Sequence, residues 1–353
     1  MVRAPLPLPA DQPAAAGVRR LPARRTLNRL VWGLAAMGMG WLAQSTLQRN
    51  QLWPGLALYA LASGLFIWKF GPHQAASQVA LELPAERPSI PARRRRLGWG
   101  LMAAGLAASL FALGMFLADT NHLAWYAYLS SLPLFLGGAW LSQLPSLHRP
   151  LASERPALLD PWLLLAILVA LAFRLYRFDT VPFGTWYDEA VAGLEARQLL
   201  QDTSFRPVFW EAMNHPTHHL YLFALAMRIW GDNILALRAV SALFGLGTVW
   251  VAYLFGRAWG GRRWGVLLAL LMATLRWDVN FSRIAMNGLD APFFEFLTLY
   301  FGQRAARAGW PRFEAAAAGL SLGLGLCFYT GFRLFVIAVI VWGVVWLVWT
   351  GWV

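Results

Sequence analysis

The stretch FDTVPFGTWYDEAVAGLEARQLLQDTSFRPVFWEAMNHPTHH, residues 178–219, interrupts a chain that is otherwise mostly apolar. It holds six carboxylates, three of the six histidines of the chain, and only two arginines. A long polar loop between membrane spans usually carries function, because no packing requirement explains it. Its sharpest feature is the adjacent pair Asp188 and Glu189, which follows Gly184 and Trp186. We therefore expect the functional site to lie in this loop.

The composition indicates a polytopic membrane protein. Of the 353 residues, 58% are hydrophobic, 14% are aromatic and only 13% are charged, which is not the composition of a soluble domain. The net charge of +13 would suggest a nucleic-acid partner in a soluble chain. Here the arginines cluster in short segments between apolar runs, as the positive-inside rule requires. We therefore expect no nucleic-acid partner, whereas membrane lipids and a phosphate-bearing ligand fit some of the arginines.

The apolar runs predict an all-α, polytopic integral membrane protein with about ten transmembrane helices. Its outer loop is expected to contain interfacial helices. The predicted spans are residues 30–47, 52–70, 97–117, 123–142, 161–177, 235–257, 264–276, 289–303, 314–330 and 332–350. The shorter apolar segment 217–230 is interpreted as a helix along the outer interface. Counting it as a span would move the basic residues 260–263 to the outside, against the charge rule.

The same rule predicts the orientation and the domains. A cytoplasmic, disordered tail of residues 1–29 precedes a four-span unit of residues 30–142, and a linker of residues 143–160 leads to a membrane domain of residues 161–353. The arginine-rich tail and connections belong on the cytoplasmic side of the plasma (inner) membrane, which places the acidic loop on the extracytoplasmic side.

The pair of carboxylates has two interpretations. One residue acts as a general base and the other as a metal ligand or helix cap. Alternatively, Asp188 caps a helix that begins at Glu189, and Glu189 favours the positive end of that helix. The residues alone leave both interpretations open.

The histidines form the segment His215-Pro216-Thr217-His218-His219. If the segment is helical, His215 and His219 lie one turn apart on one face, which is usable spacing for a metal. Because the sequence shows no third ligand, we favour interfacial histidines on the polar face of a horizontal helix. A role for His215 near a phosphate or an acceptor stays open.

Arg238, Arg283 and Arg333 are single arginines at or near the outer ends of predicted spans. Each alone is explained by a side chain that reaches the lipid headgroups. Together, on the same side as the acidic loop, they predict a cluster that binds phosphate.

The order of these features resembles a known superfamily. A span, an outer loop with an Asp-Glu pair and a His-Pro segment are followed by LRAVSALFG at residues 237–245 and FSRIA at residues 281–285. Over about residues 160–350 the chain resembles the GT-C superfamily of polyprenyl-phosphate-sugar-dependent glycosyltransferases. The nearest group is family 39, which holds the protein O-mannosyltransferases and the lipid A aminoarabinose transferases.

The resemblance implies a membrane glycosyltransferase that moves a sugar from a polyprenyl-phosphate carrier to a protein, lipid or glycan acceptor outside the cell. It implies that Asp188 is the catalytic acid of the first outer loop, with Glu189 as its neighbour in the motif, and that Arg238 and Arg283 match recurring arginines. A divalent metal ion or arginines would neutralise the leaving phosphate.

The chain departs from the family in several respects. Some relatives carry an acidic residue and a lysine before a Pro-Pro pair, where this chain has residues 214–217, NHPT. Metal dependence is therefore open, and Glu211, with His215, His218 and His219, is the remaining candidate for a metal or acceptor site. The first four spans lie outside the resemblance. Relatives usually continue beyond the span that precedes Val353, so we expect a truncated product, an incomplete chain or a short member that is inactive alone.

A transporter or carrier-lipid-binding protein without transfer chemistry is the main alternative, and a degenerate scaffold is a third. A transporter should place charges or broken helices near the middle of the bilayer. Here the charges lie in loops and at the ends of spans, which favours the transferase. The sugar, the acceptor and the oligomeric state stay undetermined by the sequence.

Overall fold

The computed structural model describes residues 23–49, scattered positions within 51–65, and residues 90–143, 160–210, 215–307 and 312–351. The chain divides into two compact units, Met1–Arg87 and Pro88–Val353. In the first unit, helix α1 (Ala23–Gln48) covers the first predicted span and begins inside the predicted tail. Most of the second predicted span and of the linker, together with Glu211, lies outside the described residues.

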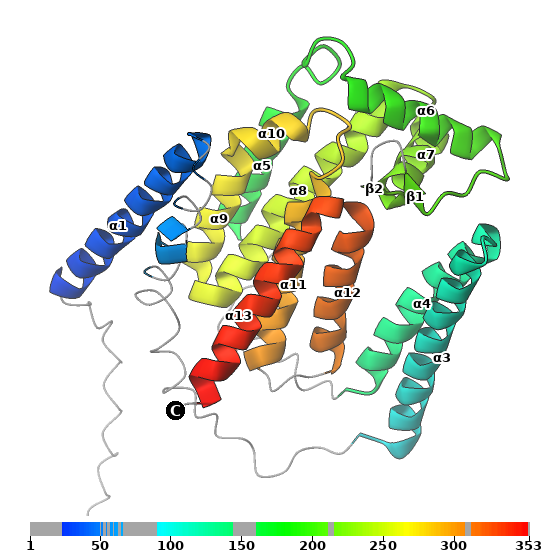
Figure 1. Cartoon of the computed structure of the whole chain (residues 1–353), viewed down its shortest axis with the longest axis horizontal. Helices are drawn as coiled ribbons and strands as arrows, with labels where there is room; N and C mark the ends of the chain where they lie inside the picture. The colour runs from blue at the N-terminus through cyan, green and yellow to red at the C-terminus, as the bar shows by residue number, and fades with distance from the viewer. Residues whose placement is uncertain are drawn as a thin grey trace, which may run out of the picture. The chain divides into compact units, whose positions relative to one another are not determined.

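The second unit is almost wholly helical, as the sequence predicts (Figure 1). Its helices are α3 (Ala92–Leu117), α4 (Asn121–Leu141), α5 (Pro161–Leu175), α6 (Tyr187–Gln201), α7 (His218–Trp230), α8 (Ile234–Gly260), α9 (Arg262–Thr274), α10 (Arg276–Phe281), α11 (Asp290–Arg307), α12 (Arg312–Phe328), the 3-10 turn η4 (Thr330–Phe332) and α13 (Arg333–Gly351). Strands β1 (Phe209–Trp210) and β2 (His215–Pro216) form one antiparallel pair.

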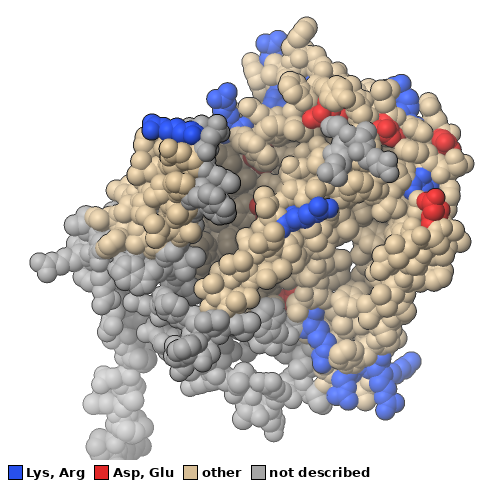
Figure 2. Space-filling view, in the orientation of Figure 1, with Lys and Arg blue, Asp and Glu red and all other residues tan. Residues whose placement is uncertain are grey.

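Two of the described helices, α3 and α8, are long and apolar enough to cross a membrane. Helix α5 and residues 330–345 are apolar but shorter. Many large apolar side chains of α3, α5 and α13 are exposed, which a soluble protein of this size would avoid. Figure 2 shows basic side chains gathered where α3 begins, while the surface of α3 and α4 above them is nearly free of charge. These features fit a membrane protein, whereas ten spans and their orientation stay predictions.

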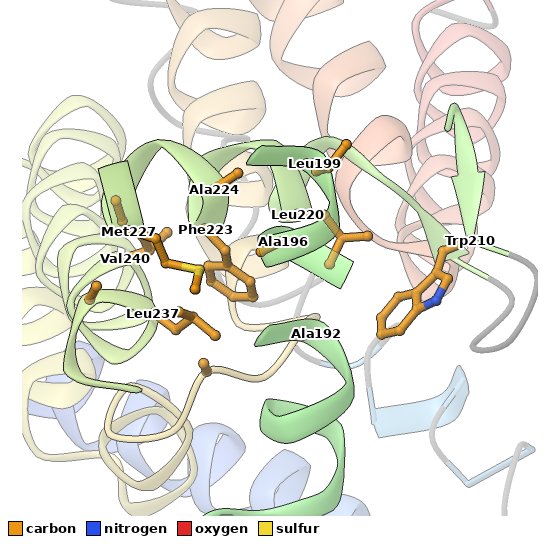
Figure 3. Packing of buried hydrophobic residues seen from close by; sticks show 13 residues of the cluster. Ala192, Ala196, Leu199, Trp210, Leu220, Phe223, Ala224, Met227, Leu237 and Val240 are labelled. Carbon is orange, nitrogen blue, oxygen red and sulfur yellow. The ribbon is translucent and has the colours of Figure 1, made fainter. Parts of the chain in front are cut away.

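Helix α8 is the centre of the second unit. One buried cluster joins it to α6 and α7, where Leu237 faces Phe223 and Met227 and lies close to Ala192 (Figure 3). A second cluster, which includes Tyr253, joins α8 to α5 and α9. Because α8 has buried residues along most of its length, the loops at its two ends are positioned relative to one another.

Asp160, the N-cap of α5, connects the start of that helix to α8 and α9. Its carboxylate accepts hydrogen bonds from the backbone N–H of Trp162, at 3.0 Å, and from the Tyr253 hydroxyl, at 2.6 Å. Arg262 donates to both carboxylate oxygens, at 2.7 and 2.9 Å. The Arg262 guanidinium therefore holds the pKa of Asp160 well below its usual range. This pair ties the start of α5 to the turn between α8 and α9.

Helices α3 and α4 form a close hairpin that packs against α12. The hairpin depends on small residues, because a side-chain carbon added at Gly138 would lie 2.6 Å from the carbonyl oxygen of Gly98. Gln143, at the end of α4, donates to Glu314 at 3.0 Å and accepts from the backbone N–H of Phe313 at 2.8 Å. Helices α3 and α4 belong to the same compact unit as residues 161–353, and the predicted four-span unit of residues 30–142 stays a prediction.

Candidate active site

The loop that precedes α6 is held by its own backbone. Helix α5 ends at Leu175, and Gly184 has a φ of +76°, which a residue with a side chain rarely adopts. The backbone N–H of Trp186 donates to Glu189 at 2.9 Å, so that Glu189 caps the start of α6. The interpretation of one of the two carboxylates as a helix cap therefore applies to Glu189.

Glu189 is completely buried, and both of its oxygens are used inside the protein. Arg238 donates to them at 2.8 and 3.0 Å, and the backbone N–H of Ala285 donates at 2.8 Å. Arg238 also donates to the carbonyl of Gly184 at 2.7 Å. A bidentate ion pair of this kind joins α6, α8 and the loop after α10.

Arg283 holds the end of α5 and the start of the loop. Its guanidinium donates to the carbonyl oxygens of Phe173, Arg174, Tyr176 and Val181, at distances of 2.5–2.9 Å. Phe173 and Arg174 lie in the last turn of α5, whose carbonyls have no partners within the helix, and Tyr176 and Val181 follow that turn. Arg238 and Arg283, which were predicted to bind phosphate, direct these donors to Glu189 and to backbone carbonyls, and a phosphate-binding role for them stays a prediction.

A second buried ion pair holds the end of α5 to α10. Arg174 of α5 and Asp278 of α10 form an ion pair in which both side chains are fully buried. Arg174 also donates to Ser282 at 3.2 Å and to the carbonyls of Ala273 and Met272, at 3.2 and 3.1 Å. Gly245 leaves the space for this pair, because an added side-chain carbon would lie 2.7 Å from the Arg174 Nε. The sequence reasoning missed this pair, although an arginine in an apolar span was itself a signal for a buried partner.

Asp188 differs from its neighbour. It is half-buried at the start of α6 and has no hydrogen-bond or ion-pair partner among the described residues. Burial lowers the pKa of His215, and the negative charge of Asp188 opposes this shift. The two side chains therefore interact electrostatically. Asp188 is thus the carboxylate of the pair that is available to a ligand.

His215 connects this carboxylate to the turn after α12. It lies in β2, where it pairs with Trp210, and not on the helix that begins at His218. The one-turn spacing of His215 and His219 therefore does not occur. The Nδ1 atom of His215 lies 3.3 Å from the Thr330 hydroxyl. The ring centres of His215 and Tyr329 are 5.2 Å apart.

Arg333 completes the group. It is exposed and begins α13, three residues after Thr330, so its positive charge adds to that of the helix N-terminus. Tyr329 and Thr330 were not singled out from the sequence, and they meet His215 because β2 packs against α12. Figure 1 shows α6, α7 and the two strands close to the upper ends of α12 and α13.

His218 and His219 begin α7 and point into packed surroundings. The His218 Nε2 lies 3.2 Å from the Tyr128 hydroxyl. His219 is 3% exposed, between Trp210 and Phe223, and its two ring nitrogens lack hydrogen-bond partners among the described residues. Burial lowers the pKa of His219 to about 3, so its ring is neutral at pH 7.

Within the described part of the chain, no three His, Cys, Asp or Glu side chains are grouped closely enough to hold a metal ion. Asp188 and His215 supply two candidate ligands, and Glu211 lies outside the described residues. The described residues therefore do not fit a divalent metal, and we derive no step through one.

An apolar cavity of about 290 Å³ lies between α7, α8 and α11. Its wall includes Leu225 and Leu243, which are exposed, so the cavity opens at the surface. Phe244 also lines it and contacts Phe328 at 5.6 Å between ring centres. Phe328, which packs on this lining residue, directly precedes Tyr329.

Comparison with known proteins bears on the same part of the chain. Residues 214–353 match the family model described as dolichyl-phosphate-mannose-protein mannosyltransferase. Neither the curated proteins nor the solved structures include a match. The matched segment contains the three histidines and all three predicted arginines, whereas Asp188 and Glu189 precede it. The resemblance of this chain to the GT-C glycosyltransferases is therefore confirmed through its residues 214–353.

Proposed function

We propose that the protein is a membrane glycosyltransferase that moves a sugar from a polyprenyl-phosphate carrier to an acceptor hydroxyl at the extracytoplasmic face. The family match supports a transferase that uses a lipid-linked sugar. The observation that carries the proposal is the contact of His215 with Thr330, three residues before Arg333, together with the electrostatic interaction of His215 with Asp188. A carboxylate that takes a proton and a cation that binds phosphate are the groups that such a transfer needs.

The proposed reaction is a displacement at the anomeric carbon of the sugar. The acceptor oxygen forms a bond to that carbon, and the bond from the carbon to the phosphate oxygen breaks. Asp188 takes the proton of the acceptor hydroxyl as a general base. Arg333 binds the phosphate, which gains negative charge as it leaves with the polyprenyl chain.

The apolar cavity supports a lipid-linked donor. It is lined by side chains such as Leu225, Leu243 and Phe244, and it opens at a surface rich in exposed apolar residues. A polyprenyl chain would reach this cavity from the bilayer, so van der Waals packing against the lining, and not removal from water, would hold it there. Phe328 packs on the lining residue Phe244 and directly precedes Tyr329, so the other end of the carrier would lie toward Tyr329 and Arg333.

The acid–base assignment predicts a large loss of transfer for Asp188→Asn. In membranes that contain equal amounts of protein, we expect about 100-fold slower transfer of a labelled sugar from polyprenyl phosphate. Asp179→Asn is the matched control, since Asp179 is an exposed carboxylate of the same loop. Transfer by Asp188→Asn at the rate of this control would contradict the role of Asp188. Retained binding of the carrier with no transfer by the wild type would favour the alternative of a carrier-lipid-binding protein.

The phosphate assignment predicts that Arg333→Gln slows transfer by about 10- to 100-fold, because the leaving phosphate loses a cation. Arg333→Lys is expected to recover part of the rate, since it restores the charge without the planar fork. The measurement is kcat and KM for the lipid-linked donor. Arg228→Gln is a useful control, because Arg228 is an exposed arginine near the end of α7, away from η4. Equal rates for the two glutamine variants would remove Arg333 from the site.

A further inference from the structure

The α3–α4 hairpin lies outside the family match, yet it reaches the proposed active end. Trp125 of α4 contacts the rings of His218 and Tyr221, at 5.0 and 4.5 Å between ring centres. The Tyr128 hydroxyl, one turn further along α4, lies 3.2 Å from the His218 Nε2. The ring of His218 also lies 5.6 Å from that of Phe328 in α12, between ring centres. The first turn of α7 is therefore in contact with both the hairpin and the last turn of α12.

The opposite end of the hairpin is fixed independently. The backbone carbonyl of Ser142 accepts from Arg312 at 3.0 Å, and the amide of Gln143 donates to Glu314 at 3.0 Å. Gln143 and Glu314 are 5% and 2% exposed, so this contact is dry and directional. Because both ends of the hairpin are held, the position of Tyr128 along α4 and its orientation beside His218 are fixed.

His218 depends on this contact. Its Nδ1 atom is buried and has no hydrogen-bond partner among the described residues, which leaves the Tyr128 hydroxyl as the polar contact of its ring. Burial lowers the pKa of His218 to about 4, so the ring is neutral at pH 7. A hydrogen bond at one ring nitrogen sets the tautomer and the ring plane of a neutral histidine.

The backbone from His218 to His215 is short and tightly held. Thr217 is fully buried, and its hydroxyl donates to the carbonyl of Pro207 at 2.8 Å. Its backbone N–H donates to Val208 at 3.2 Å. Thr217 therefore couples the position of the first turn of α7 to that of His215, whose Nδ1 lies 3.3 Å from the Thr330 hydroxyl.

We propose that Tyr128 is a positioning residue of the transferase, and that the α3–α4 hairpin serves to fix the histidine segment through the contact of Tyr128 with His218. This inference rests on the proposed function for its catalytic consequence, although the contact itself does not. The hairpin then contributes to catalysis by positioning the histidine segment. The sequence had suggested a separate unit with no assigned mechanism.

The test is Tyr128→Phe in the full chain, with Tyr126→Phe as the matched control. Tyr126 lies two residues away on α4 and is 73% exposed, while the phenylalanine at 128 keeps the ring contacts with Trp125 and His218. We expect kcat for sugar transfer to fall about three- to tenfold in Tyr128→Phe, the effect of one lost hydrogen bond, with the donor KM unchanged and the thermal midpoint lowered by no more than the loss of that one bond. The control should equal the wild type.

A second readout does not require activity. Diethyl pyrocarbonate modifies histidine rings, and the modified positions are located by mass spectrometry of the digested protein. We expect His218 to react several-fold faster in Tyr128→Phe than in Tyr126→Phe. Equal labelling would overturn the contact, and faster labelling with unchanged kcat would overturn the positioning role. If the wild type transfers no sugar, the proposed function fails, and the labelling still decides whether Tyr128 holds His218.

Discussion

Glu189→Ala is expected to destabilise the second unit by about 3–5 kcal/mol, because it leaves the buried Arg238 guanidinium without its carboxylate. The side chains of the pair are 2% and 0% exposed, so water cannot replace the lost partner. The variant also loses the contacts to the backbone N–H groups of Trp186 and Ala285. Thermal unfolding of the purified protein in detergent measures this effect, and transfer should be lost with the fold.

The control for this prediction is Asp179→Ala, which removes an exposed carboxylate from the same loop. Adding Arg238→Met to Glu189→Ala should recover part of the stability, since the double variant has no unpaired charge. A Glu189→Ala protein as stable as the control would show that the ion pair does not hold the loop. Because Asp188→Asn should leave the fold intact, the two neighbours are distinguished by stability and not only by activity.

Arg174→Met is expected to have an effect of similar size, about 3–5 kcal/mol, since it leaves Asp278 buried without its cation. Arg174 also supplies donors to Ser282 and to the carbonyls at the end of α9, so α10 should loosen. The measurement is again the thermal midpoint, together with protease cleavage after residues of α10. The matched control is Arg177→Met, which changes an exposed arginine at the end of the same predicted span.

The pH dependence of this defect has a defined sign. Burial raises the pKa of Asp278 to about 6, and Arg174 opposes that rise. Removing Arg174 therefore raises the pKa of Asp278 further above its unfolded value of about 3.9. A carboxyl with a raised pKa in the folded state favours folding at low pH, and this contribution is lost as the pH rises through the folded pKa. The defect of Arg174→Met should thus be smaller at pH 5 than at pH 8, and adding Asp278→Asn should remove that difference.

The two arginines of the motif segments make contacts that the sequence did not predict. Arg238 and Arg283 stand at the outer ends of predicted spans, where a role in binding phosphate is a reasonable expectation. In the structure their donors point at Glu189 and at backbone carbonyls of the loop. The exposed Arg333 is left as the arginine that the proposed reaction uses. The loop that carries Asp188 is held by arginines on the two segments that carry the family resemblance.

The sequence by itself determined the helical membrane class, because long apolar runs with arginines between them have few other stable arrangements in a cell. It also pointed to the loop of residues 178–219 and to the family, since the polar segment stands out against its apolar surroundings. What it left open was the division of roles between Asp188 and Glu189. Neighbours on a helix point in different directions, and no local pattern says which of them meets a buried partner.

Only the tertiary structure shows that Glu189 is the carboxylate with buried partners, because those partners are distant in sequence. Glu189 meets Arg238 across 49 positions, Arg174 meets Asp278 across 104, and His215 meets Thr330 across 115. Such contacts depend on how α5, α8 and α12 pack, and each pairing is one of many that the charges alone would allow. The same packing brought α4 to His218, which no periodicity in residues 92–141 predicts.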